Sequence, residues 1–447
     1  MRLHVRHVLH VFAIAATSSL CGAQGAVATR SEASGSASDV PPSRSTALPP
    51  WLHIGGQVRA RAEGYTGGGF KPDNSDSYIL TRLLINARMQ ATPKASLFVE
   101  GMDARGLWKD EAPAGPPFRD NMDLRQLYLQ VGADKDPAAL RAGRLELGFG
   151  DGRLVGALPW ANTARTFDGA RASFAGTGYR VDAFAASVVK VVQNKFDRNV
   201  AGNNFYGLYS SFSQVVPRSV AEPFFFWRRQ SGLTNEAGAR GTMNFGTLGF
   251  RGVGKLPANF DYDTQLASQH GSLAGESIRA EAAHAALGYT IATMPRTPRL
   301  FAEYNYASGD ENPTDNKRGT FDQLYPTGHD KYGLTDLVGW QNMKHVRGGV
   351  DVAIAKGWSA TARYSSYWLA NARDALYSGG GAPVARSVTG VAGTYVGREV
   401  DLIASGKLKE GLGFSAGLGR FIPGTFLKNT TPGKPYTYPY AMVTWDF

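Results

Sequence analysis

The sequence predicts an all-β fold, a transmembrane antiparallel up-and-down β-barrel of about 18 strands, and three observations predict it. The last segment alternates between two faces, with Ala441, Val443 and Trp445 on one of them, and it ends on an aromatic residue, Phe447. Strand-like segments bounded by turn residues follow one another from Trp51 onward. The linkers between them alternate between short and long, as periplasmic turns and extracellular loops of a membrane barrel do.

The expected strands were placed by alternation and by the Gly, Pro, Asn and Asp residues that separate them. They are residues 51–65, 77–90, 95–107, 122–132, 138–148, 166–175, 179–191, 203–213, 221–230, 239–253, 257–269, 276–291, 298–308, 345–355, 358–371, 396–408, 410–421 and 437–447. The long linkers are 66–76, 108–121, 149–165, 192–202, 309–344, 372–395 and 422–436. A C-terminal edge strand of a soluble sheet is the alternative interpretation of the last segment.

Composition supports a barrel over a helical membrane protein. No stretch beyond the N-terminus approaches the roughly 20 apolar residues that a spanning helix needs. The 54 glycines, 19 tyrosines and 23 phenylalanines among 447 residues suit short strands, tight turns and aromatic girdles.

The N-terminus has the features of an export signal. Arg2 and Arg6 precede a short apolar core, and small residues follow it, so we expect a signal peptide over residues 1–23. Cys21 is the only cysteine, and its removal leaves no thiol chemistry in the mature chain. Residues 24–50 are rich in Ser, Ala and Pro and are expected to be disordered, and the barrel is expected over 51–447.

The side chains that face the lumen can be identified from charge, because a bare Arg in the hydrocarbon of a barrel wall costs roughly 2–4 kcal/mol. The first strand then turns Arg59, Arg61 and Glu63 inward and Val58 outward. The arginines expected inside are Arg59, Arg61, Arg82, Arg88, Arg144, Arg171, Arg240, Arg279, Arg347 and Arg363. The acids expected on the same faces are Glu63, Glu146, Asp182, Glu281, Glu303, Asp351, Glu399 and Asp401.

Two interpretations of these inward charges are open. The arginines form cross-barrel pairs with carboxylates and rigidify the wall, or their surplus lines a pore that favours anions. The net charge of +11, in a chain addressed to the envelope, favours an anionic partner such as lipopolysaccharide phosphate or an anionic solute, and makes nucleic acid an unsuitable one.

Several short motifs follow one another along the chain. They are residues 124–129 (LRQLYL), 140–144 (LRAGR), 151–156 (DGRLVG), 160–171 (WANTARTFDGAR), 307–310 (ASGD), 320–326 (TFDQLYP), 397–401 (GREVD) and 420–424 (RFIPG). Their order and spacing resemble those of the alginate-export outer-membrane proteins, and the resemblance covers nearly the whole mature chain. It implies an 18-stranded monomeric barrel of the bacterial outer membrane that conducts an anionic polyuronate through an arginine-lined constriction gated by loops.

The resemblance also implies which arginines bear the function. They are Arg125, Arg144, Arg153, Arg165, Arg171 and Arg398, with Glu399 and Asp401 as acidic partners. Two of them fit the alternation poorly, since Arg125 shares a face with Leu127 and Arg398 shares one with Val400, which indicates a bulge or a different register. A general anion-selective diffusion or uptake porin is the alternative function on the same fold.

No cofactor and no catalytic site are expected. The mature chain contains five histidines, His53, His270, His284, His329 and His345, and none lies in a recognisable hydrolase or metal motif. The acids at 310–315 only faintly suggest calcium. The expected partners are the outer-membrane lipid, the anionic solute, and the barrel-assembly machinery, contacted through the strand that ends at Phe447.

Overall fold

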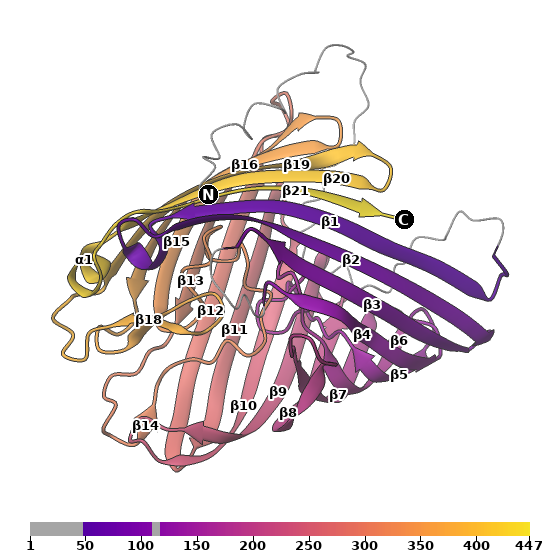
Figure 1. The fold of residues 1–447 in the computed structure, drawn as a ribbon, viewed down its shortest axis with the longest axis horizontal. Coiled ribbons are helices and arrows are strands. Elements are labelled where there is room, and N and C mark those ends of the chain that lie inside the picture. The colour runs from indigo at the N-terminus through magenta and orange to yellow at the C-terminus, as the bar shows by residue number, and fades with distance from the viewer. Residues whose placement is uncertain (1–47, 110–116) are drawn as a thin grey trace. The chain divides into compact units, whose positions relative to one another are not determined.

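The computed structural model describes residues 48–109 and 117–447, so the expected signal peptide and nearly all of the Ser/Ala/Pro-rich segment lie outside the described residues. One antiparallel sheet closes on itself, because the first strand pairs with both the second and the last. Figure 1 shows these terminal strands, β1 in indigo and β21 in yellow, side by side. The fold is therefore a closed barrel of 18 strands, as expected.

The wall strands match the expected segments closely. They are β1 (Leu52–Thr66), β2 (Ser75–Thr92), β3 (Ala95–Leu107), β4 (Asp120–Val131), β5 (Ala138–Leu145), β6 (Phe167–Gly176), β7 (Tyr179–Lys190), β8 (Arg198–Phe212), β9 (Ser219–Thr234), β10 (Arg240–Lys255), β11 (Phe260–Leu273), β12 (Glu276–Thr290), β13 (Arg299–Ala307), β15 (Met343–Ala355), β16 (Trp358–Leu369), β19 (Tyr395–Lys409), β20 (Leu412–Pro423) and β21 (Tyr436–Asp446).

The remaining elements lie in the loops of one rim. They are η2 (Gly68–Phe70), β14 (Lys317–Arg318), β17 (Ala375–Tyr377), β18 (Pro383–Arg386) and α1 (Thr425–Thr430). The opposite rim has short turns, such as 93–94 and 356–357. Two connections depart from the expected alternation, since at the long-loop rim β9 and β10 are joined by residues 235–239 and β11 and β12 by Ala274 and Gly275 alone. No helix within the described ranges is both long and apolar enough to cross a membrane.

The outer surface has the apolar band that lipid requires. Side chains of the strand centres, such as Leu129, Leu248 and Leu266, are 61%, 65% and 56% exposed. Aromatic pairs flank this band, with Trp445 and Phe447 (ring centroids 5.2 Å apart) near the short turns. The pair Trp368 and Tyr395 (5.7 Å) lies near the long loops. This distribution is the aromatic girdle pattern of a membrane barrel.

The lumen is largely filled by two long loops. The β5–β6 loop (146–166) and the β13–β15 loop (308–342) join at a parallel bridge between Val155 and Tyr325. The backbone N–H of Gly156 donates to the Tyr325 carbonyl (2.9 Å), and a side chain on Gly156 would collide with Thr327. Both loops bury apolar residues against an aromatic inner wall of β7 to β10, which includes Phe184, Phe205, Phe224, Phe226 and Phe245.

Candidate functional site

Arginines of β1 and β2 hold the β5–β6 loop inside the barrel. Arg59 donates to the carbonyls of Pro159 (2.7 Å) and Ala161 (3.3 Å). Arg82 donates to the same two carbonyls, at 3.0 and 3.3 Å, and to Gln57 Oε1 at 2.7 Å. All the acceptors named here are neutral, so these bonds position the loop without cancelling the positive charge.

Trp160, at the centre of this loop, connects the two lumen loops. The guanidinium of Arg61 lies 3.9 Å from its ring centroid, and Arg61 Nη1 donates to the Trp160 carbonyl (2.6 Å). Trp160 also contacts His329 of the β13–β15 loop, whose ring stacks on the Trp160 ring with centroids 3.7 Å apart. Arg61 also pairs with Glu63, which accepts from Tyr78 Oη (2.7 Å).

Most other expected arginines are neutralised by carboxylates. The bulge between Glu100 and Gly101 in the β3–β4 pairing leaves Arg125 as an extra residue, so Arg125 and Gln126 both turn inward. There Arg125 pairs with Glu100 and Glu146. The poor alternation of the sequence at Arg125 is thus explained by a bulge.

A buried ionic network forms around Glu303 on β13. Arg347 Nε donates to Glu303 Oε2 at 3.0 Å, and Arg153 Nη2 lies 3.8 Å from Glu303 Oε1. Arg153 also contacts Asp151 (3.2 Å), and Lys331 contacts the same carboxylate (3.3 Å). Burial acts to raise the pKa of Asp151, but these two cations together hold that pKa well below its ordinary value. The network ties both lumen loops to the wall.

Arg171 and Arg363 of the expected set are also paired, whereas Arg88 donates to neutral groups, Ser96 Oγ (3.3 Å) and Gln130 Oε1 (3.2 Å), and Arg240 is exposed. Arg171 donates to Asp182 (3.0 Å), which accepts from Arg180 as well. Arg363 pairs with Asp330. Burial acts to raise the pKa of the Asp330 carboxyl, but the Arg363 guanidinium holds that pKa below its ordinary value. Asp351 accepts from Arg299 at 3.1 Å.

Two expected pore arginines lie on the outer register and are corrected. Arg398 is exposed beside Val400 on β19. The bulge in the β16–β19 pairing lies between Tyr395 and Gly397, so it precedes Arg398 and does not change its face. Arg144 pairs across the strands with Leu127, an outward residue, and with Asp168. Arg144 Nε donates to Asp168 Oδ1 at 2.8 Å, so its charge is matched outside the pore. Arg279 and Glu281 are likewise exposed on the outer register of β12.

The acids beside Arg398 do turn inward, but they contact other groups. Glu399 accepts from the backbone N–H of Thr335 (2.9 Å) and from Tyr367 Oη (3.2 Å). Asp401 is fully buried opposite Arg363 in the strand register. Neither acid serves as a partner of Arg398, because adjacent residues of a strand point to opposite faces.

Arg165 differs from the paired arginines. Its Nη1 donates to the carbonyls of Gly156 (3.2 Å) and Pro326 (2.9 Å), one on each lumen loop. No carboxylate within the described part of the chain forms an ion pair with it. Burial lowers the pKa of Arg165 to about 10, opposed by Tyr325 and reinforced by the neighbouring cation Arg228. At neutral pH it therefore stays a half-buried positive charge without a carboxylate partner in the described part of the chain.

Arg165 lies on the wall of a cavity of about 980 Å³ on the long-loop side of the constriction. The arginines that line this cavity are Arg61, Arg165, Arg228, Arg318 and Arg386. Its acids are Glu63, Glu236, Asp322 and Asp336. Arg228 pairs with Asp322 (2.9 Å) and Arg61 pairs with Glu63, so three further arginines face two further acids and the cavity has a positive surplus.

Three of the cavity arginines, Arg228, Arg318 and Arg386, were missed by the sequence analysis. Arg318 and Arg386 lie in short loop strands whose position in the cavity depends on tertiary structure. Arg228 follows Phe224 and Phe226 on the inward register, which was assumed to be polar. Buried aromatic residues at every second position before Arg228 are the signal that could have identified its direction.

A closed barrel with an apolar outer band and charged residues around an internal constriction defines an outer-membrane channel. Residues 50–438 match the model of the alginate export family, and the chain belongs to that family. It is a protein of the bacterial outer membrane.

Solved structures with the same fold include barrels of Pseudomonas aeruginosa and Acinetobacter baumannii. Pseudomonas aeruginosa OpdQ is 11% identical, with a TM-score of 0.59 over 89% of this chain and 97% of that one. Pseudomonas aeruginosa OpdK, solved with vanillate, is 10% identical, with a TM-score of 0.61 over 88% and 98%. Acinetobacter baumannii OccAB2 is 12% identical, with a TM-score of 0.57 over 88% and 98%. No curated protein matches the sequence.

Proposed function

We propose that the channel passes an anionic polysaccharide, an alginate-like polyuronate, or a related anionic solute, through a pore lined by arginine. The observation that carries this proposal is Arg165, a half-buried cation on the cavity wall whose hydrogen-bond acceptors are backbone carbonyls. Such a cation attracts an incoming carboxylate more strongly than an arginine already neutralised by the protein does.

Membership of the alginate export family supports the polyuronate as cargo. A polyuronate has one carboxylate per sugar, so it can be passed from one arginine to the next if each site binds weakly. Arg61, already shared between Glu63 and Trp160, and Arg228, shared with Asp322, offer weakened charges of this kind. Arg165 lies among them and supplies the strongest attraction.

A general uptake porin for small anions is the second candidate. It is favoured by the fold similarity to OpdK, which was solved with vanillate, a small carboxylate. The buried loops narrow the lumen in either case, so the two functions differ in the length of the solute and not in its charge.

The test is block of single-channel current by an oligouronate in planar bilayers. We expect Arg165→Gln to weaken the block at least tenfold, because the glutamine amide still donates one hydrogen bond but has no charge. Arg165→Lys should retain most of the block. Arg398→Gln is the matched control, since it removes one positive charge from the outer face. The oligouronate should block its current as it blocks that of the unaltered protein. An unchanged block in Arg165→Gln would contradict the proposal.

We also propose that the strand ending at Phe447 is presented to the barrel-assembly machinery and that the channel works as a monomer. The seam that this strand closes depends on Phe447, whose backbone exchanges two hydrogen bonds with Gly56 (2.9 and 3.0 Å). Outside the barrel, exposed basic residues near the long loops, such as Arg279 and Arg398, suit lipopolysaccharide phosphates.

A further inference from the structure

The N-terminal end of β4, at the long-loop rim, has no neighbouring wall strand on its β5 side. β4 pairs with the short β5 only from Leu127 to Val131, so residues 120–126 extend beyond it toward the long-loop rim. The β7–β8 loop (191–197) lies against this exposed end. The backbone N–H of Asp197 donates to Asp123 Oδ2 at 2.6 Å.

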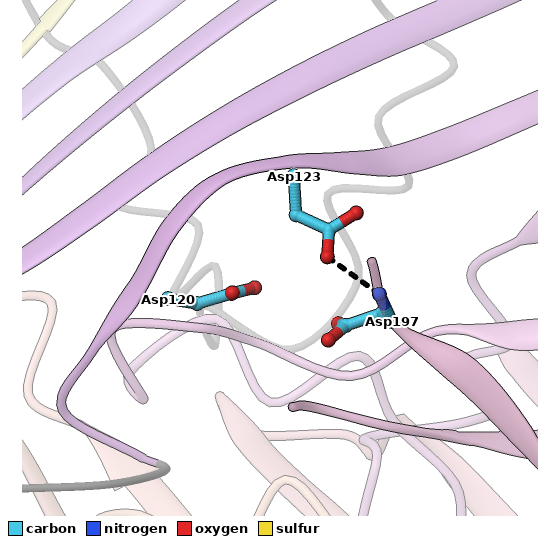
Figure 2. Close-up of side chains that lie close together, drawn as sticks. All are labelled: Asp120, Asp123 and Asp197. Atoms are coloured by element: carbon cyan, nitrogen blue, oxygen red, sulfur yellow. Dashed lines mark hydrogen bonds between the residues drawn. The ribbon is translucent and has the colours of Figure 1, made fainter. Parts of the chain in front are cut away.

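Three carboxylates meet where the loop contacts the strand. One oxygen of each of Asp120, Asp123 and Asp197 lies within 4.8 Å of the others. Figure 2 shows the side chains of Asp120 and Asp123 converging on Asp197. Asp120 is 0% and Asp123 5% exposed, so water does little to screen their repulsion. Arg144 donates to the backbone carbonyl of Asp197 (3.0 Å), but its charge is matched by the Asp168 carboxylate.

The carboxylate of Asp120 points into this cluster without a hydrogen-bond partner. Both of its oxygens are buried, and neither accepts a hydrogen bond from any residue the structure describes. A buried carboxylate in this condition is costly unless a cation binds it. The other two are held in place, since Asp123 accepts from the backbone N–H of Asp197, and Asp197 accepts from that of Val192 (2.7 Å).

We propose that Asp120, Asp123 and Asp197 form a calcium site that fastens the β7–β8 loop to the N-terminal end of β4. Carboxylate oxygens are ligands of hard divalent cations, and Ca²⁺ tolerates irregular shells of six to eight oxygens completed by water, whereas Mg²⁺ demands near-octahedral geometry. The site is separate from the arginine-lined cavity, so it does not depend on the proposed solute.

The first test is calorimetric titration of Ca²⁺ into the folded mature chain in detergent. We expect one ion per chain, with an affinity near that of extracellular calcium modules, on the order of 10⁻⁴–10⁻³ M. Asp120→Asn should weaken binding at least tenfold. Asp315→Asn is the matched control, because it removes an acid from the exposed part of the β13–β15 loop, and it should bind like the unaltered protein.

A second readout, proteolysis by trypsin, is made first on the unaltered protein and so does not depend on the folding of a variant. Calcium should slow tryptic cleavage after Lys195, an exposed residue of the β7–β8 loop, and a chelator should restore the rate. Asp197→Asn should abolish this protection. No binding by the unaltered protein at several millimolar Ca²⁺, or undiminished binding by both Asp120→Asn and Asp197→Asn, would overturn the proposal.

Discussion

At the scale of the residue, the partner of each arginine decides its role. Arg125 and Arg165 both lie inside the barrel, yet one contacts two carboxylates and the other contacts carbonyls. The first is a structural tie, and the second is the cation that we propose for solute binding. Neither role can be predicted from the residue type, because the partners come from segments distant in sequence.

We expect Arg125→Leu to destabilise the barrel by about 3–5 kcal/mol, because it leaves Glu100 and Glu146 buried without a cation. Reversible urea unfolding in detergent micelles measures this. Arg171→Leu is the matched control, and its cost should be smaller, since Asp182 keeps its contact with Arg180. Equal costs for the two variants would contradict this assignment.

Glu236, on the cavity wall, should make selectivity depend on pH. Burial, with Asp310 as the next cause, raises the pKa of Glu236 to about 7. As pH falls from 8 to 6 this carboxylate gains a proton, the cavity becomes more positive, and anion selectivity should increase. Reversal potentials across that range measure the effect, which Glu236→Gln should reduce. A selectivity that increases with pH would be the opposite of this prediction.

At the scale of the element, the two lumen loops determine how open the channel is. The β5–β6 loop is attached to the wall by arginines and to the β13–β15 loop by the stack of Trp160 on His329. The sequence predicted a long loop at each position, and the family resemblance implied that loops gate the channel. The inward packing depends on pairings such as Val155 with Tyr325, which no local pattern reveals.

Removing the Trp160 side chain should loosen this constriction. Trp160→Ala eliminates both the stack on His329 and the contact with the Arg61 guanidinium, so we expect a larger single-channel conductance and more frequent switching between levels. Trp445→Ala, on the outer face near the short turns, is the control and should leave the conductance unchanged. Identical conductance in Trp160→Ala and the unaltered protein would show that the loops are held by other contacts.

At the scale of the whole molecule, the barrel was predictable and its interior was only partly so. Alternation and turn residues located nearly all strand boundaries, because one face of each strand contacts lipid. The inner face of β7 to β10 is aromatic, since the lumen loops bury it, and the assumption of a polar lumen therefore failed at Arg228. Arg144 was misplaced because its charge was taken to indicate the inner face, and Arg398 because family motifs do not specify which face of a strand a residue occupies.

The most direct test of the central claim is the reversal potential of the unaltered protein in a planar bilayer under a salt gradient, with an oligouronate then added. We expect anion selectivity and a current blocked by the oligouronate but not by a neutral oligosaccharide of equal length. Cation selectivity would contradict the arginine-lined pore. An anion-selective current indifferent to the oligouronate would contradict the polyuronate as cargo and favour a general porin.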